Sequence, residues 1–497
     1  MTVRGKISSA APPAGECTET KGAPQHIGEA HCFEALGQRI VLNVATSLFY
    51  AVNNVAFELV EDAPGTNWAN ALRRAKRRFR ARDVDDAAAY LEREHFLGLP
   101  KKTSPPPSPG LRPLSTLELC VTHACNLACR YCYGRNGHGD NPLYGSAIAH
   151  MPVEVAIKAV DLFWAGSGKL KELNLTFFGG EPLLNLALMR TVAEYCHAKE
   201  KDTGKKIHFS VATNGTLLDD EAVAFVREFK VGVQVSIDGP AELHNRNRSF
   251  RDGTGSYDSV IAGVRRLRAG RKTRIPARIT AAHGAMDNLE VFRHLTDLGF
   301  ASVHIEPALG GGCNGAELTA EDVDELLRQE EAVARYFVES IHAGRYANYH
   351  GLVRHLRDTR VVHDRRRHYC GAGRGLICVS NEGGFYPCHR FVGVKEYCLG
   401  SVETGIEHAG RHPFHALHVD ARPGCRECWA RYFCGGGCWN HAHTAHGGLE
   451  RPDEEGACRL LRRQIELAMA VNAALDVPDQ AVISGIYDET TLPHLKA

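Results

Sequence analysis

The stretch that decides the fold is residues 115–134, Ser-Thr-Leu-Glu-Leu-Cys-Val-Thr-His-Ala-Cys-Asn-Leu-Ala-Cys-Arg-Tyr-Cys-Tyr-Gly. A β-type run, Leu117 to Thr122, leads into a loop that carries Cys125, Cys129 and Cys132. Four thiolates would close the coordination of a [4Fe–4S] cluster, so three leave one iron open to a substrate or cofactor. The alternative is a structural zinc knuckle, but such sites prefer CxxC pairs and four protein ligands. The loop therefore predicts an iron–sulfur cluster with one open corner.

The CxxxCxxC spacing, with Tyr131 directly before the third cysteine, resembles the signature of the radical S-adenosylmethionine (SAM) superfamily. This resemblance implies that SAM chelates the open iron, and it makes Tyr131 a cofactor-binding candidate. It also implies that an electron, from a donor such as flavodoxin or ferredoxin, cleaves SAM to a deoxyadenosyl radical that abstracts hydrogen from the substrate. The cofactors then carry the chemistry, and the protein supplies orientation, shielding and redox tuning.

The composition argues against several classes of function. With 59 Lys and Arg against 58 Asp and Glu, the charge is balanced, so we expect neither a nucleic-acid nor a membrane partner. The sequence has no run of about 18 apolar residues and no signal-peptide pattern, which predicts a cytoplasmic protein. In that reducing compartment the 17 cysteines indicate metal ligands rather than disulfides. Those outside the two cysteine motifs are expected to be small buried residues: Cys17, Cys32, Cys120, Cys196, Cys313, Cys378 and Cys398.

Periodicity and composition divide the chain into segments. The predicted order is a disordered leader (1–28), a small domain of short strands and helices (29–100), a Pro-rich linker (101–115), a βα barrel (116–310), a helical connector (311–369), a Cys-rich domain (370–475) and a tail (476–497). The small domain resembles the winged-helix-like module with which many peptide-modifying enzymes hold the leader of their substrate. The alternative is that it only covers the barrel.

The barrel segment alternates β-branched runs with amphipathic helical stretches, which is typical of βα units around a parallel sheet. The predicted strands cover 117–122, 172–178, 207–213, 232–238, 274–280 and 302–306, and they fit an α/β fold with a partial (β/α)6 radical SAM barrel. Helices are expected from Pro152 to Trp164 outside the sheet, at 318–341 with Thr319 as its cap, and at 459–475. We expect the run of Arg and His between residues 354 and 368 to be solvated.

Ligands of parallel sheets bind at the carboxyl ends of the strands, where further polar motifs stand. The second predicted strand is followed by Gly179-Gly180-Glu181, whose glycines would let backbone approach the amino group of the cofactor while Glu181 accepts from it. A tight turn is the alternative. The fourth predicted strand carries Ser236, with Arg248 twelve residues later. This pair resembles a motif of peptide-modifying members, which implies that Ser236 meets the ribose and Arg248 holds the carboxylate of SAM. The alternative for Arg248 is a solvated loop residue.

A second cysteine array extends from residue 370 to residue 458. Its spacing, Cx12Gx4C, then CxxCx5CxxxC, then C, resembles the SPASM extension of radical SAM enzymes, which holds two auxiliary [4Fe–4S] clusters. A pair of zinc ribbons is the alternative. The resemblance implies that one auxiliary cluster takes Cys370, Cys388 and Cys438, and the other takes Cys425, Cys428, Cys434 and Cys458. The first is one ligand short, so either Cys378 or Cys313 completes it, or the position stays open for a substrate thiolate.

The local sequence around Cys370 and Cys388 resembles thioether-forming peptide maturases, including those that act on SCIFF-type peptides and on a subunit of quinohemoprotein amine dehydrogenase. The resemblance implies that the enzyme joins Cys sulfur to carbon in a small Cys-containing peptide or protein subunit. Sulfatase-maturing relatives carry an Asp after the equivalent of Cys388, where this chain has His389, a candidate base. The alternatives are a carbon–carbon crosslink, a sulfatase-type oxidation of Cys or Ser, and a non-catalytic zinc-binding scaffold.

Overall fold

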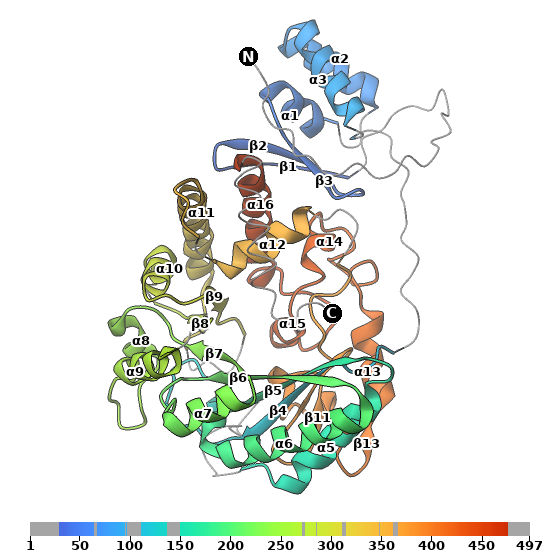
Figure 1. Ribbon diagram of the computed structural model, residues 1–497. Helices are drawn as coiled ribbons and strands as arrows, with labels where there is room; N and C mark the ends of the chain where they lie inside the picture. Colours follow the sequence, from blue (N-terminus) through green and yellow to red (C-terminus); the bar gives the residue numbers. More distant parts are fainter. Residues whose placement is uncertain are drawn as a thin grey trace.

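The central element of the structure is a sheet of eight strands in the order β11-β10-β4-β5-β6-β7-β8-β9 (Figure 1). We describe it from a computed structural model, which places residues 29–63, 67–94, 96, 111–136, 150–270, 274–284, 286–310, 315–346, 348–360 and 366–475. The predicted leader (1–28) and tail (476–497), Cys17 and Cys313 therefore lie outside the described residues, as does most of the Pro-rich linker.

Six parallel strands form the barrel portion, and each lies within two residues of its predicted bounds: β4 (Thr116–Thr122), β5 (Glu172–Gly179), β6 (Lys206–Thr213), β7 (Gly232–Ser236), β8 (Pro276–Ala281) and β9 (Ser302–Pro307). Two short strands outside the six predicted for the barrel extend the sheet beyond β4. Of these, β10 (Leu376–Val379) pairs with β4 in parallel, and β11 (Phe385–Tyr386) pairs with β10 in antiparallel orientation. The Cys-rich region is thus joined to the barrel by backbone hydrogen bonds.

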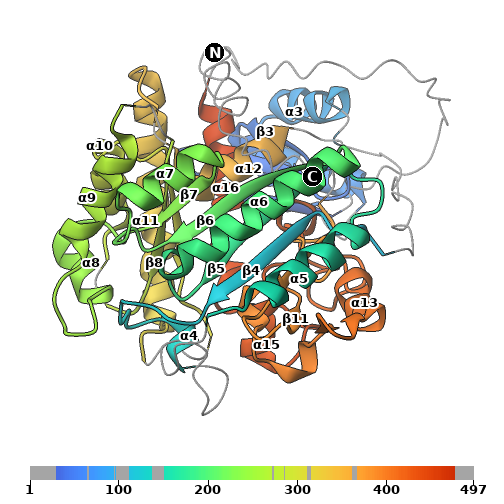
Figure 2. The same ribbon diagram turned by 60° about the horizontal axis from the view of Figure 1, so that its bottom comes forward.

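Helices cover the outer face of the sheet (Figure 2). Pro152 precedes α5, and the spacing of Ala156, Val160 and Phe163 places these buried residues against the strands. The predicted helix outside the sheet is therefore present. The helices and short turns of the barrel are α4 (Tyr133–Asn136), α5 (Val153–Gly166), η1 (Pro182–Asn185), α6 (Leu186–Thr203), α7 (Asp220–Glu228), α8 (Ala241–Asn247), α9 (Tyr257–Arg268) and α10 (Asn288–Asp297).

The N-terminal part is a small sheet with its own helical cover. Its strands β1 (Ala30–Ala35), β2 (Gln38–Asn43) and β3 (Leu48–Val52) are antiparallel neighbours. Its helices α1 (Asn54–Glu61), α2 (Trp68–Arg78) and α3 (Ala81–Arg93) bury a separate apolar core against β2. Helix α2 was not predicted from the sequence, and its mean hydropathy is low because five of its eleven residues are Arg or Lys.

The C-terminal elements pack beside the barrel and under the small sheet (Figure 1). They are α11 (Ala320–His342), α12 (His350–Arg360), η2 (His389–Phe391), η3 (Lys395–Tyr397), β12 (Gly400–Ser401), β13 (Gly405–Ile406), α13 (His408–Ala416), α14 (Arg431–Cys434), α15 (Trp439–His446) and α16 (Ala457–Ala474). A capping box of Thr319 and Asp322 begins α11, as the sequence predicts. Helix α16 contacts α11, α12 and all three strands of the small sheet, so it joins the three parts of the molecule.

Two sequence predictions about exposure are wrong. The described part of the basic run 354–368 is not solvated, because α12 packs against α16 and buries His355 completely. Cys120, Cys196 and Cys378 are buried as expected, but Cys398 is exposed and Cys32 is half-buried, since both lie on the outer parts of small elements. Within the described ranges, no helix is both long and apolar enough to cross a lipid bilayer.

Candidate iron–sulfur and cofactor site

The loop of Cys125, Cys129 and Cys132 follows the carboxyl end of β4 and is held by backbone hydrogen bonds. Ala128 donates its N–H to the carbonyl of Ser249 over 2.8 Å, and Arg130 donates to the carbonyl of Asn247 over 3.0 Å. The three thiols lie close enough for their charges to interact. Burial raises the pKa of Cys129 to about 12; the charge of Arg248 opposes this, and the Cys132 and Cys125 thiols add to it. The structure therefore brings the predicted trio together in a half-buried loop.

Gly179 and Gly180 allow a close approach of two backbones. A Cβ atom at Gly179 would stand 2.1 Å from the carbonyl oxygen of Thr122, and one at Gly180 would stand 2.2 Å from that of Ala124. Gly179 also has a φ of +137°, which L side chains rarely adopt. These glycines therefore let their own backbone lie close to the start of the cysteine loop. From the sequence alone, we expected them to let backbone approach the cofactor.

Glu181 is fully buried, and its carboxylate accepts hydrogen bonds from the segment after β5 and from the end of β6 and the loop that follows it. Its Oε1 accepts from the hydroxyl of Thr213 over 2.7 Å and from the N–H of Leu183 over 3.1 Å, and its Oε2 accepts from the N–H of Asn214 over 2.7 Å. The amide of Asn214 in turn donates to the side chain of Asn126 in the cysteine loop. Burial raises the pKa of Glu181 to about 7 in spite of these hydrogen bonds. A carboxylate offers about four acceptor positions, so Oε2 retains capacity for a further donor.

Arg248, Tyr131 and Asp238 form one buried network. The Nε of Arg248 donates to Oδ1 of Asp238 over 3.1 Å, and the hydroxyl of Tyr131 donates to Oδ2 over 2.5 Å. The guanidinium also lies 5.2 Å from the centre of the Tyr131 ring. Arg248 is thus a buried residue rather than a solvated loop residue, and only its Nη groups remain to meet a carboxylate. Ser236, at the end of β7, is half-buried beside this network.

The thiols of the second array separate into two groups. Burial, then the charges of Glu118, Cys438 and Cys370, raise the pKa of Cys388 well above its usual range. Burial, followed by the Cys434, Cys425 and Cys428 thiols, raises that of Cys458 while Arg462 opposes it. Cys388 thus lies near Cys370 and Cys438, and Cys458 lies near Cys425, Cys428 and Cys434.

His389 and Cys378 have well-defined neighbours. The backbone N–H and the Nδ1 of His389 contact the same oxygen of Glu118, at 2.8 Å and 3.0 Å, and its ring stacks on Phe178 at 4.2 Å. The sulfur of Cys378 lies 3.5 Å from that of Cys120 on the neighbouring strand, and both are fully buried. Sequence reasoning missed the parts played by Glu118 and Asp238. The only signal for Glu118 was a charged residue inside an apolar strand.

The donor set fits iron–sulfur clusters. In the part of the chain that the structure describes, no three His, Cys, Asp or Glu side chains converge closely enough to hold a single metal ion. A [4Fe–4S] cluster spreads its thiolates over separate irons and does not require that convergence. The raised thiol pKa values mean that iron must displace protons on binding, as it does at thiolate sites generally.

Comparison with known proteins identifies the class. Residues 119–295 match the model of the radical SAM superfamily, and with the barrel and its cysteine loop they identify a radical SAM enzyme. This match implies SAM and at least one [4Fe–4S] cluster as cofactors.

Curated relatives include a serine-type anaerobic sulfatase-maturating enzyme of Bacteroides thetaiotaomicron, 27% identical over 67% of this chain and 84% of that protein. A cysteine-type anaerobic sulfatase-maturating enzyme of Clostridium perfringens is 25% identical over 66% of this chain and 89% of that protein. Among solved structures, anSMEcpe with bound AdoMet has a TM-score of 0.61 and 22% identity, covering 75% of this chain and 98% of that one, which supports the fold.

Proposed function

We propose that this radical SAM enzyme matures a small ribosomally made peptide or protein subunit by joining Cys sulfur to carbon. The relatives named above support a protein substrate, because they are sulfatase-maturating enzymes. A structure of native anSMEcpe contains both AdoMet and the Cp18Cys peptide. In this proposal the N-terminal sheet and helices hold the leader of the substrate, and a flavodoxin or ferredoxin supplies electrons.

The proposed cofactor contacts lie at the carboxyl ends of the barrel strands and in the loops that follow them. Cys125, Cys129 and Cys132 would hold the cluster that binds SAM. The cluster and SAM together would supply the radical that abstracts hydrogen from the substrate. The Oε2 of Glu181, which accepts one hydrogen bond from the protein, receives the amino group of SAM. The Nη groups of Arg248 hold its carboxylate, because Asp238 already fixes the Nε edge. Tyr131 fixes the other oxygen of Asp238 and so supports Arg248.

Two auxiliary clusters complete the proposed cofactor set. One is held by Cys425, Cys428, Cys434 and Cys458, which form a closed ligand set. The other is held by Cys370, Cys388 and Cys438, which leave one corner for the thiolate of the substrate. The observation that carries this proposal is the position of Cys378. Its sulfur is buried against Cys120, which favours a packed thiol over a fourth ligand.

His389 is the proposed base for the thiol proton of the substrate. It follows the proposed cluster ligand Cys388 directly, and its side chain is 28% exposed. Because Nδ1 faces the carboxylate of Glu118, the ring holds its proton there and presents the lone pair of Nε2. Glu118 is therefore a positioning residue for His389.

The ligand assignment is tested by iron and sulfide analysis of anaerobically purified variants. Three cubane clusters bind about twelve irons per chain by ligand count. We expect C378A to keep that content and the spectrum of the auxiliary clusters, and C438A to lose about four irons. Loss of iron in C378A would contradict the open corner. A chain that binds zinc in place of iron would establish the scaffold alternative.

The product is tested by mass spectrometry on a short Cys-containing peptide encoded beside the gene and co-expressed with it. A peptide that forms a thioether loses two hydrogens and one alkylatable thiol, whereas a peptide that forms a carbon–carbon link keeps its thiol. The sulfatase-maturating relatives favour a second candidate, oxidation of Cys or Ser to formylglycine. That product is an aldehyde that reacts with hydrazines. His389 in place of the Asp of those enzymes argues against it.

A further inference from the structure

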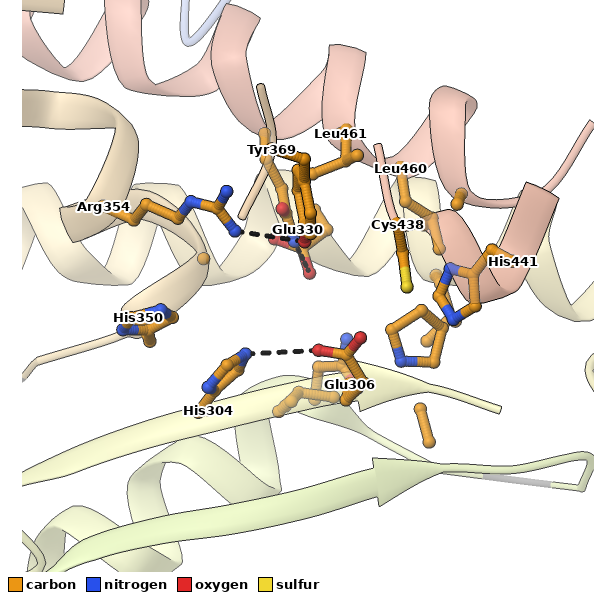
Figure 3. Close-up of a pocket in the computed structure, with 18 residues that line it drawn as sticks. His304, Glu306, Glu330, His350, Arg354, Tyr369, Cys438, His441, Leu460 and Leu461 are labelled. Atoms are coloured by element: carbon orange, nitrogen blue, oxygen red, sulfur yellow. Dashed lines mark hydrogen bonds and ion pairs between the residues drawn. The ribbon is translucent and has the colours of Figure 1, made fainter. Parts of the chain in front are cut away.

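A cavity of about 60 Å³ lies between the barrel and the Cys-rich region. Its walls come from the ends of β8 and β9, from α11 and α12, and from α16. Figure 3 shows Cys438 and His441 at one end of the cavity, and Arg354 and His350 at the other. Because Cys438 is a proposed ligand of the open auxiliary cluster, this cavity adjoins the place where the substrate Cys would bind.

Most charged groups around the cavity already have partners. Glu306 on β9 pairs with Arg278 and with His304, both at 3.3 Å. Arg354 donates to the hydroxyl of Tyr369 over 3.1 Å. Glu306 is thus paired with Arg278 and His304, and Arg354 has a hydroxyl partner.

Glu330 on α11 is different. It is 3% exposed, and its Oε1 accepts from the hydroxyl of Tyr349 over 2.6 Å and from Nε2 of Gln464 over 3.3 Å. Its Oε2 has no hydrogen-bond partner, and no Lys, Arg or His of the described chain forms an ion pair with it. Removing a carboxylate from water costs several kcal/mol unless a charge or enough hydrogen bonds compensate it. A cation brought by a ligand would supply that compensation.

Two further features of the lining indicate the shape of such a ligand. Asn288 is fully buried, and neither atom of its side-chain amide has a partner, so it offers one acceptor and two donors, as a peptide group requires. Leu326, Leu460 and Leu461 give the cavity an apolar wall. A long aliphatic stem that ends in a cation suits this combination.

We propose that the cavity binds a lysine or arginine side chain of the peptide substrate, with Glu330 pairing its charge and Asn288 meeting its backbone. The inference rests on the proposed function and adds a sequence requirement to it: a basic residue next to the Cys that reacts. The pocket selects this residue because an apolar or acidic side chain would leave Glu330 uncompensated.

The test uses the cluster-loaded, SAM-bound chain and anaerobic calorimetry with three probes, acetyl-Ala-X-Ala-amide in which X is lysine, norleucine or glutamate. We expect the lysine probe to bind about tenfold more tightly than the norleucine probe, the factor that about 1.4 kcal/mol of charge pairing gives. The glutamate probe should bind most weakly of the three. E330Q should remove the preference for lysine. Glu331→Gln is the matched control, since Glu331 is the next residue and pairs outside the cavity with Arg335 and Arg463.

Equal binding of the lysine and norleucine probes, no binding of any probe, or a preference that survives in E330Q would each overturn the proposal. If E330Q fails to fold, the order of the three probes on the unaltered chain still decides. A lysine preference without any modified product would overturn the proposed function and leave this cavity assignment standing. Thioether formation without a lysine preference would overturn the cavity assignment and leave the proposed function standing.

Discussion

At the scale of single residues, two buried carboxylates differ in the hydrogen bonds that they accept. Glu181 accepts hydrogen bonds from three protein donors, which fix the loops beside the cysteine trio. Glu330 accepts from two and keeps one oxygen without a partner. Burial raises the pKa of each to about 7. The two carboxylates therefore differ in that both oxygens of Glu181 have protein donors, whereas Oε2 of Glu330 has none.

The raised pKa of Glu330 predicts a pH-dependent stability. In the unfolded chain this carboxyl ionises near 4.5, while in the folded chain it holds its proton to about 7. The folded state therefore loses stability as the pH rises through that window. Replacing Glu330 with Gln removes the loss, so E330Q should gain about 1 kcal/mol more over the parent at pH 8 than at pH 6. Urea unfolding of the loaded protein at the two pH values measures this, and an equal gain at both would contradict it.

At the scale of elements, α11 holds Glu330 in place and its start is well determined. The hydroxyl of Thr319 accepts from the N–H of Asp322, and Asp322 accepts from the N–H of Thr319. This capping box satisfies two amide groups that the first turn leaves without helical partners.

Loss of the cap should weaken the helix at that end. We expect Thr319→Ala to reduce the free energy of unfolding by about 1 kcal/mol and to speed hydrogen exchange in the first turn of α11. Thr319→Ser retains a hydroxyl acceptor and serves as the control, with a loss below about half of that. Identical exchange in both variants would show that the cap does not determine where this helix begins.

At the scale of the whole molecule, α16 joins parts that lie far apart in the sequence. Its Glu466 meets Nε2 of His31 in β1 over 2.9 Å, and the ring of His31 stacks on Trp429 of the Cys-rich region at 3.9 Å. The small N-terminal sheet therefore packs against the Cys-rich region.

Removing this contact should loosen the N-terminal sheet without disturbing the clusters. An aromatic pair contributes about 0.5–1.5 kcal/mol beyond area burial, so His31→Ala should raise hydrogen exchange across β1, β2 and β3 by up to about tenfold. Iron content should be unchanged, because His31 is not among the proposed ligands. His31→Phe keeps the stacking and should exchange more slowly than the alanine variant. Unaltered exchange in His31→Ala would mean that other contacts hold the sheet.

The sequence by itself determined the cysteine loop, the spacing of the second array and the six barrel strands, because thiol spacing and β-branched periodicity are local properties of the chain. Strand β11 was missed because a run of two residues is too short to show a period.

The tertiary structure alone decided the contacts that span the chain. Glu118 meets His389 across 271 residues, and Cys120 meets Cys378 across 258. It also turned the glycines of the Gly-Gly-Glu motif toward the cysteine loop and placed Glu330 in a cavity beside Cys438. Such neighbours depend on how strands and helices pack against one another, and a pattern within one segment does not predict which distant residue it contacts.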